Sequence, residues 1–379
     1  MAAALAWVTR ERLATVVRGR GTKLGWGRPP SRVDVVLSTT RLSGDVVHRH
    51  GDLTATVQAG VTLADLNRQL ATQGQWLPLD TPFDAATIGG MVATNDAGPL
   101  RHRYGTPRDL LIGITLALTD GTVIKAGGHV VKNVAGYDLA KLISGSFGTL
   151  AAIVDATFKL LPIPRRSQTV VAEYADSDLL AKDAATLACS QLEPVAFDVH
   201  VLAGEPAGAP RCAIAARFAT SPEATTIQTS AARALFHGES RVLTDAAEAA
   251  WWSEQVRRPW TLPGTVVRLG WMPAALPEVL ALVADLRRST GGPVELTGRA
   301  ALGAGLLRLD AEDAATAVAI EQLRASHRLV SNITVLRQSP VMKRTVDPWG
   351  PAGSTAALLA SLKRTFDPAG ILNAGRGPI

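Results

Sequence analysis

Cysteine is nearly absent from this sequence, and its scarcity excludes several classes of protein. The 379 residues contain two cysteines, Cys189 and Cys212. Two thiols cannot form a disulfide framework, and a self-contained iron–sulfur cluster needs about four cysteine ligands. Long apolar runs are also missing, and without a run of about 18 such residues no membrane-spanning helix is expected. The sequence therefore predicts a protein of a reducing compartment without an iron–sulfur cluster of its own.

Signals for export and for nucleic-acid binding are weak as well. The stretch before Arg10 is too short for a signal peptide. The net charge is +6, but Lys and Arg are spread without a block of five, which favours attraction for an anionic ligand over nucleic acid. With 47% apolar and 19% charged residues, the composition is that of a globular protein. We expect a cytoplasmic protein, with association with the inner face of a membrane through a partner left open.

Glycine, in contrast, is plentiful, and residues 82–150 are dense in it. Gly89 and Gly90 form a pair there, and Gly145 and Gly148 lie near the end of the stretch. Only glycine adopts positive φ freely, and only glycine leaves space where a Cβ would clash. This stretch therefore predicts backbone that comes close to a large ligand.

A second glycine-rich stretch lies at residues 18–27, where four glycines occur within nine residues. Successive backbone N–H groups in such a loop can converge on phosphate oxygens, and the Thr22 hydroxyl can add a donor. The spacing is not Gly-x-Gly-x-x-Gly, and no helix with an acidic ribose contact follows, which argues against a Rossmann dinucleotide site. Taken alone, the loop is equally consistent with an ordinary glycine-rich turn.

The hydrophobic pattern predicts mainly strands up to residue 164. The expected strands lie at 14–17, 33–37, 54–58, 110–118, 122–125 and 151–161, and the expected helices at 2–13, 63–74 and 138–143. Pro162 and Pro164, followed by two arginines, then mark a boundary.

Beyond this boundary strands and helices alternate regularly. The first predicted set is strand 168–174, helix 177–190, strands 195–202 and 212–218, helix 222–236 and a strand near 241. The second is strand 265–271, helix 276–289, strands 293–297 and 304–309, helix 313–326 and strand 330–336. Two successive β-α-β-β-α-β units indicate ferredoxin-like halves in an α+β domain. A helix at 354–366 follows, and the Pro- and Gly-punctuated residues 367–376 indicate a segment that is tied down.

Taken together, these stretches resemble the FAD-binding family that contains vanillyl-alcohol oxidase and the p-cresol methylhydroxylase flavoprotein. The matching residues are 18–22, 87–95, 131–138, 145–150 and 367–373. Within this family, residues 98–105 and 132–139 look most like the FAD-binding subunits of bacterial glycolate oxidase. The resemblance implies an α+β fold: a two-subdomain FAD-binding domain at 1–164, a ferredoxin-like α+β cap or substrate domain at 165–340, and a C-terminal segment at 341–379 that returns to the flavin.

The resemblance also implies which residues hold FAD. Residues 18–23 would wrap the pyrophosphate, and Pro82 and residues 87–94 would line the long axis of the cofactor. Gly145, Thr149 and Ile153 would contact its far side, and Asn373 would approach the flavin from the tail. The full implied set is Arg18, Gly19, Arg20, Gly21, Thr22, Lys23, Pro82, Thr87, Ile88, Gly89, Gly90, Ala93, Thr94, Gly98, Tyr104, Asn133, Gly136, Tyr137, Asp138, Gly145, Thr149, Ile153 and Asn373.

The sequence departs from the family in the groups that would do chemistry. Members with covalent flavin often carry a histidine just after the first-loop glycines, where Thr22 and Lys23 stand here, so non-covalent FAD is expected. Related 2-hydroxy-acid dehydrogenases carry a metal-linked His pair and a Glu-His-Gly block, and the seven histidines here fit neither pattern. We therefore assign no catalytic residue and no metal site. The strand and helix usual ahead of the first loop are mostly absent, so either the start is assigned late or that edge is trimmed.

The resemblance implies an FAD-dependent oxidoreductase, the FAD-binding subunit of a glycolate oxidase-type complex. Hydride from glycolate, which becomes glyoxylate, would pass chiefly to a flavin in a larger catalytic flavoprotein subunit. Electrons would then pass to an iron–sulfur subunit, with this chain supporting electron transfer or assembly. The alternatives are a self-sufficient FAD-dependent 2-hydroxy-acid or alcohol dehydrogenase or oxidase, and a structural subunit that has lost its cofactor.

Two groups of residues keep more than one interpretation. Tyr137 and Asp138 could lie near the flavin, but we favour an ordering role in which Asp138 caps the helix that follows. Trp251, Trp252 and Trp260 could face a partner, because tryptophan is enriched at interface hot spots, or could pack in the core around a helix end.

Overall fold

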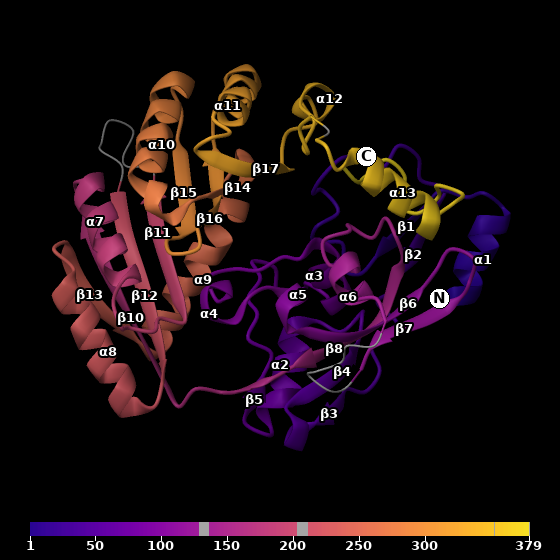
Figure 1. Cartoon of the computed structure of the whole chain (residues 1–379), viewed down its shortest axis with the longest axis horizontal. Helices are drawn as coiled ribbons and strands as arrows, with labels where there is room; N and C mark the ends of the chain where they lie inside the picture. Colours follow the sequence, from indigo (N-terminus) through magenta and orange to yellow (C-terminus); the bar gives the residue numbers. More distant parts are fainter. Residues whose placement is uncertain (129–135, 203–210, 352, 379) are drawn as a thin grey trace. The chain divides into compact units, whose positions relative to one another are not determined.

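The computed structural model describes residues 1–128, 136–202, 211–351 and 353–378, and these form two compact units (Figure 1). The first unit comprises Met1–Gly98, Tyr104–Ile163 and the tail from Pro351. The second comprises Pro99–Arg103 and Pro164–Gly350. The tail thus rejoins the unit in which the chain began. The functional division at residues 164 and 340 stays a prediction.

An antiparallel sheet with strand order β3-β4-β8-β6-β7 carries the core of the first unit. Helices α3 and α6 pack against its strands β8 and β6. The buried side chains of Leu116, Ile143 and Phe158 fill the space between these elements. A smaller parallel pair, β1 and β2, is extended by the tail, because Thr15 forms a parallel bridge with Leu372.

The elements of the first unit agree with most of the expected ones. Its strands are β1 (Thr15–Arg18), β2 (Val35–Ser38), β3 (Val47–Arg49), β4 (Thr54–Gln58), β5 (Gln75–Trp76), β6 (Leu111–Ala117), β7 (Val123–Gly127), β8 (Ala152–Lys159) and β9 (Leu161–Pro162). Its helices are α1 (Ala2–Arg10), η1 (His50–Asp52), α2 (Leu63–Ala71), α3 (Ile88–Thr94), α5 (Pro107–Leu110), α6 (Leu139–Ile143) and α13 (Ala356–Phe366), and α4 (Arg101–Tyr104) lies where the chain crosses between units.

Local sequence explains where these helices begin. The Thr62 hydroxyl accepts the Asp65 N–H at 3.1 Å and starts α2, whose Leu66 and Leu70 are buried at the four-residue spacing of one helix face. Asp138 likewise accepts the Lys141 N–H at 3.1 Å and caps α6, as the favoured interpretation of this residue predicts. Short capped helices of this kind place glycine-rich backbone beside the sheet.

The second unit is built on one continuous sheet with strand order β13-β10-β12-β11-β15-β16-β14-β17. Its first four strands come from the first β-α-β-β-α-β set and its last four from the second, so the two predicted ferredoxin-like halves are confirmed. They join edge to edge through the antiparallel pair β11 and β15. The elements are β10 (Arg166–Tyr174), α7 (Ser177–Ala188), β11 (Ala196–Leu202), β12 (Arg211–Thr220), α8 (Pro222–Leu235), β13 (Glu239–Thr244), α9 (Asp245–Thr261), β14 (Thr265–Trp271), η2 (Pro273–Ala275), α10 (Leu276–Thr290), β15 (Val294–Arg299), β16 (Ala304–Leu309), α11 (Asp313–Ala325), β17 (Val330–Arg337) and α12 (Met342–Thr345).

Helices cover the two faces of this sheet unequally. The helices α7, α8, α10 and α11 bury one face in a large apolar core, which takes Phe197, Val199 and Val201 from β11. The alternate residues of β11 point to the other face, where α9 packs. There Trp252 is 6% exposed and belongs to a buried apolar cluster with Val171, so for this tryptophan the core interpretation is correct.

Helix α9 was not expected from the sequence, and charges fix it at both ends. Near its start, buried Glu248 accepts hydrogen bonds from Ser167 at 2.9 Å and from Thr169 at 2.6 Å. Near its end, Arg258 pairs with Glu295 at 2.8 Å. These polar contacts hold α9 to the sheet. The helix therefore lacks the continuous apolar stripe from which an amphipathic helix is predicted in a sequence.

The face of the second unit under α9 holds buried polar groups. Arg299 donates two hydrogen bonds to Asp198, at 3.0 and 2.9 Å. His200 lies beside them, fully buried, with its ring 5.2 Å from that of Trp251. Among the described residues neither ring nitrogen of His200 has a hydrogen-bond partner. Burial, with the neighbouring charges of Arg299 and Arg258, lowers the pKa of His200 to about 3.

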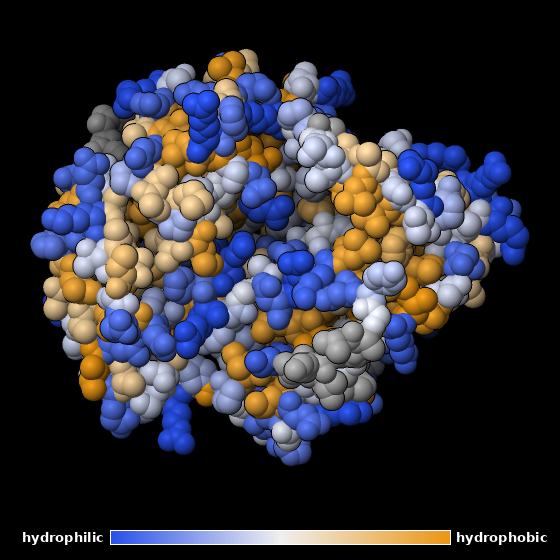
Figure 2. All heavy atoms as spheres, in the orientation of Figure 1, coloured by the Kyte–Doolittle hydropathy of each residue, from blue (hydrophilic) through white to orange (hydrophobic). Residues whose placement is uncertain are grey.

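The outer surface offers a contrast to these buried faces. Apolar side chains lie in several small groups between hydrophilic ones on the face drawn in Figure 2. Tyr137, which the resemblance places near the flavin, is 91% exposed.

The buried His200 predicts a loss of stability in mild acid. Above a pH of about 6.5 the imidazole is neutral in the folded and unfolded chain, so it contributes no pH dependence. As the pH falls from there toward 3, only the unfolded chain gains the proton, and unfolding is favoured. At pH 5 this costs about 2 kcal/mol. We expect His200→Leu to leave the free energy of unfolding nearly unchanged at pH 7.5 and to recover about that amount at pH 5, measured by denaturant unfolding. His327→Leu, at an exposed histidine, serves as the control, and an equal gain there would contradict the assignment.

Candidate functional site

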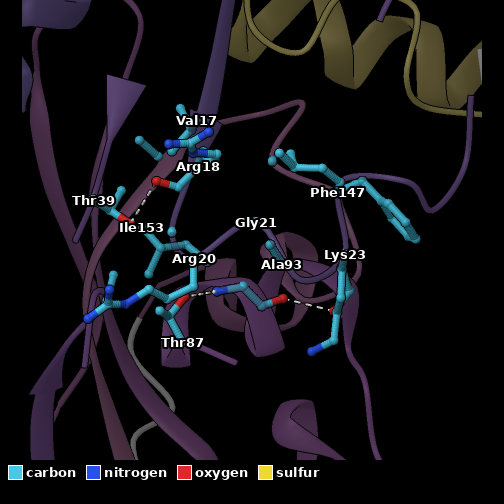
Figure 3. Close-up of a pocket in the computed structure, with 18 of the residues that line it drawn as sticks. Val17, Arg18, Arg20, Gly21, Lys23, Thr39, Thr87, Ala93, Phe147 and Ile153 are labelled. Carbon is cyan, nitrogen blue, oxygen red and sulfur yellow. Dashed lines mark hydrogen bonds between the residues drawn. The ribbon is translucent and has the colours of Figure 1, made fainter. Parts of the chain in front are cut away.

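A pocket in the first unit brings together the two glycine-rich stretches and the tail (Figure 3). The empty space in the pocket and at its mouth, open solvent included, is about 700 Å³. The loop after β1, helix α3 and the start of β8 supply most of the walls. The lining residues are Val17, Arg18, Gly19, Arg20, Gly21, Thr22, Lys23, Leu24, Thr39, Ala59, Thr87, Gly89, Gly90, Ala93, Thr94, Phe147, Gly148, Ala151, Ala152, Ile153 and Arg376.

The lining is basic and lacks groups that take up protons at neutral pH. Four cationic residues border it, namely Arg18, Arg20, Lys23 and Arg376. No carboxylate, imidazole or thiol belongs to the lining among the described residues. The pocket therefore suits an anionic ligand and offers no general base of its own.

The loop that follows β1 presents backbone donors. In the part of the chain that the structure describes, none of the N–H groups of residues 19–23 donates to a protein acceptor, whereas the next N–H, of Leu24, bonds to Gly21 at 3.2 Å. Gly21 has a φ of +78°, which gives the loop its sharp reversal. Consecutive N–H groups around such a residue form a concavity that binds anions.

Lys23 lies in this loop, but its ammonium is engaged elsewhere. The Lys23 Nζ is 2.8 Å from the Asp96 carboxylate, with 5% of the lysine side chain exposed. The approach is off the direction of a hydrogen bond, so the contact is electrostatic. The same ammonium lies 5.6 Å from the centre of the Trp26 ring and 6.0 Å from that of Phe83. The charge of Lys23 is therefore compensated inside the protein.

Close backbone packing explains the glycines of α3. A Cβ on Gly89 would lie 2.8 Å from the Ala59 Cβ and 3.1 Å from its carbonyl oxygen. A Cβ on Gly19 would lie within van der Waals overlap of Thr87, whose hydroxyl accepts the Gly90 N–H at 3.4 Å. Glycine at 89 and 19 thus lets α3 and the first loop approach their neighbours closely.

The tail forms the foundation of the loop. One terminal nitrogen of Arg376 donates to the carbonyl oxygens of Lys23, Leu24 and Trp26, at 2.7, 3.0 and 3.2 Å. Burial lowers the pKa of Arg376 to about 10, so the guanidinium still carries its charge at neutral pH. Asn373 donates to the carbonyls of Phe147 and Gly148, at 3.3 and 2.7 Å.

The structure brings about half of the predicted site residues to this pocket. Those that line it are Arg18, Gly19, Arg20, Gly21, Thr22, Lys23, Thr87, Gly89, Gly90, Ala93, Thr94 and Ile153. Their assignment to a cofactor stays a prediction.

The other predicted residues lie away from the lining. Ile88 is fully buried in the core, Gly98 donates its N–H to Asp80, and the ring of Tyr104 packs against Trp76. Asn133 lies outside the described residues. The rest of the set outside the lining is Pro82, Gly136, Tyr137, Asp138, Gly145, Thr149 and Asn373.

Several lining residues were missed. Phe147, Gly148 and Arg376 belong to stretches that the sequence had marked, and only their individual roles went unrecognised. Thr39 and Ala59 carry no motif. They reach the pocket because Gly60 and Gly89 allow their chain segments to come close. No local pattern in the sequence predicts these approaches.

Two further properties of the described residues bear on function. No three His, Cys, Asp or Glu side chains among them gather as a ligand set for a metal ion. None of the helices they form combines the length and the apolar character that a membrane span requires.

Comparison with known proteins gives a family for the N-terminal third. Residues 1–127 match the family described as FAD binding domain. The chain is 34% identical to glycolate oxidase subunit GlcD of Bacillus subtilis (strain 168) over 50% of its own length and 41% of that protein. It is 34% identical to glycolate oxidase subunit GlcE of Escherichia coli (strain K12) over 48% of its length and 50% of the relative. A D-lactate dehydrogenase of Archaeoglobus fulgidus is 38% identical over 45% of this chain and 38% of that enzyme. The chain thus matches half or less of each relative.

Solved structures extend the likeness to the whole chain. An alkyldihydroxyacetonephosphate synthase structure superposes with a TM-score of 0.72, covering 99% of this chain and 75% of the other at 15% identity. Such identity shows a shared fold and nothing about the reaction. The predicted fold class, an FAD-binding domain followed by a ferredoxin-like α+β domain, is confirmed.

The packing of α3 predicts a difference between two glycines. Gly89→Ala places a methyl group against Ala59, so we expect a loss of about 1–3 kcal/mol in the free energy of unfolding. Gly25→Ala is the matched control, because a Cβ there meets nothing within 4 Å, and the expected change is within about 0.5 kcal/mol. Denaturant unfolding of both variants measures the difference. Equal effects would show that α3 is not closely packed here.

Proposed function

We propose that the pocket of the first unit holds FAD non-covalently, starting from the match of residues 1–127 to the FAD binding domain family. The observation that carries this proposal is the row of five N–H groups at residues 19–23 without protein acceptors, in a basic lining. Such a row suits the two phosphate charges of FAD. Small residues at 89, 90 and 93 leave a flat wall for the long body of the cofactor.

The proposed activity is FAD-dependent oxidation of a hydroxy acid. FAD, when bound, supplies an acceptor for the two electrons that such an oxidation releases. The support comes from relatives named glycolate oxidase subunit and D-lactate dehydrogenase. This chain binds and orients the cofactor. Its pocket lining lacks carboxylates and imidazoles among the described residues, so no residue that takes the substrate proton is assigned.

The finer proposal is that the chain serves as a subunit of a glycolate oxidase-type complex. Its partners would be a larger catalytic flavoprotein and an iron–sulfur subunit, to which electrons pass. The lack of an assignable base supports this, as does the scarcity of cysteine, because an electron-transferring cluster would have to come from another chain. The second candidate is a self-sufficient FAD-dependent dehydrogenase or oxidase, favoured by the hydroxy-acid dehydrogenases among the relatives.

Purified protein should be yellow or should take up FAD with a change in flavin fluorescence. Because no histidine follows the first-loop glycines, we expect acid precipitation to leave the flavin in the supernatant. Flavin in the protein pellet would contradict non-covalent attachment. A colourless protein that takes up no FAD would favour the structural subunit without a cofactor.

Substrate addition separates the subunit from the self-sufficient enzyme. We expect the FAD-loaded chain alone to keep its flavin absorbance near 450 nm for many minutes after addition of glycolate, D-lactate or 2-hydroxyglutarate under anaerobic conditions, because the described residues that line its pocket include no carboxylate or imidazole to accept a proton. Dithionite should bleach the same sample at once and serves as the positive control. Rapid bleaching by any of the hydroxy acids would overturn the subunit proposal and support the second candidate.

A further inference from the structure

Two buried cations hold the loop at residues 19–23. Lys23 reaches from the loop to Asp96, which follows α3, and Arg376 reaches from the tail to the loop carbonyls. Both side chains belong to the first unit, and both residues are about 5–6% exposed. Together they connect the first loop to each of the other two segments that form the pocket.

We propose that Lys23 and Arg376 are positioning residues that fix the loop for its ligand, and that Lys23 acts through Asp96 instead of contacting a phosphate. This inference rests on the proposed function for the identity of the ligand. It changes the role expected for Lys23, a basic residue in a phosphate-binding loop, from that of a charge partner to that of an internal support.

The surroundings of the Lys23 ammonium carry this assignment. A carboxylate lies 2.8 Å away, and the faces of Trp26 and Phe83 lie near it. The Thr81 hydroxyl donates to the same Asp96 oxygen at 3.3 Å and holds the carboxylate in place. In Figure 3 the Lys23 side chain runs away from Gly21. To reach a phosphate, the ammonium would have to leave a buried ion pair, and a buried carboxylate without its partner is costly.

Arg376 holds the end of the loop through its backbone. Its guanidinium donates to three carbonyl groups, those of Lys23, Leu24 and Trp26. A lysine at this position would keep the charge but lacks the planar set of donors that arginine presents. A loop ordered before the ligand arrives does not lose binding free energy to ordering.

Asp96→Asn distinguishes the two roles of Lys23. If Lys23 acts through Asp96, the variant loosens the loop, and we expect FAD affinity in a fluorescence titration to fall roughly tenfold, as it should for Lys23→Met. The double variant, with Asp96→Asn and Lys23→Met together, should bind FAD no more weakly than either single variant, because both substitutions remove the same Lys23–Asp96 contact. If Lys23 contacts a phosphate directly, Asp96→Asn releases its charge and FAD binds more tightly, which would overturn the proposal. Lys23→Arg, which can keep the ion pair, should restore most of the affinity.

Arg376→Lys tests the tail. We expect a roughly tenfold loss of FAD affinity, and Arg364→Lys, an exposed arginine on α13, is the matched control with unchanged affinity. Equal affinities in both variants would overturn the role of Arg376.

Hydrogen exchange in the cofactor-free protein gives a readout that does not depend on FAD. The amides of Leu24 and Trp26, which are hydrogen-bonded to the carbonyls of Gly21 and Lys23, should exchange faster in Asp96→Asn and Arg376→Lys, while those of β4 keep their rates and show that the unit remains folded. Unchanged exchange of the loop would contradict the proposal even if affinity fell. If the unaltered protein binds no FAD, the proposed function fails, and the exchange experiment still decides whether these residues hold the loop.

Discussion

The first unit depends on a guanidinium that is buried where two distant parts of the chain meet. Arg376 satisfies three carbonyl groups of a loop about 350 positions earlier. Without Arg376 these carbonyl groups would each lose a donor, although that of Lys23 would keep the Trp26 N–H at 3.2 Å, and an unsatisfied buried polar group costs about 1–3 kcal/mol. Neighbouring hydrogen bonds also tie the tail to the first unit. Lys363 donates to the carbonyls of Thr149 and Leu372, and Asp367 accepts the N–H groups of Ile371 and Leu372. The pocket therefore depends on contacts of the tail with both the loop at residues 19–23 and the segment at residues 147–149.

The second unit depends on the joining of two sheets and on paired charges beneath α9. Two ferredoxin-like halves each have an edge strand that could pair with another chain, and joining β11 to β15 removes one edge from each. The face opposite the four core helices is unusually polar for a sheet interior. Its arginines are matched by carboxylates, as in the Arg258, Glu295 and Arg308 chain, in which Glu295 accepts from Arg308 at 3.0 Å. Such paired charges allow α9 to pack on a polar face without a continuous apolar stripe.

Much of the fold could be read from the sequence because most elements have a clear periodicity. The strands at 54–58, 265–271 and 304–309 were predicted to the residue. Helix α9 was missed, because Pro259 lies inside it and its buried face mixes Glu248, Trp252 and Gln255. The loop at residues 18–23 and the glycines of α3 were recognised by composition. The roles of Thr39, Ala59 and Asp96 were not, because each arises from a contact through space with a residue far along the chain.

The return of the tail has a consequence for the order in which the protein forms during synthesis. Residues 1–163 leave the ribosome first, but the strand that completes β1 and the arginine that supports the loop follow only after the whole second unit. Domains generally fold as units as they emerge, with the N-terminal one first. Here the second unit is completely synthesised before the first, because the first unit still lacks the tail segment that pairs with β1. Until then the β1 edge of the nascent first unit stays unpaired, and the support of the loop at residues 19–23 is completed last.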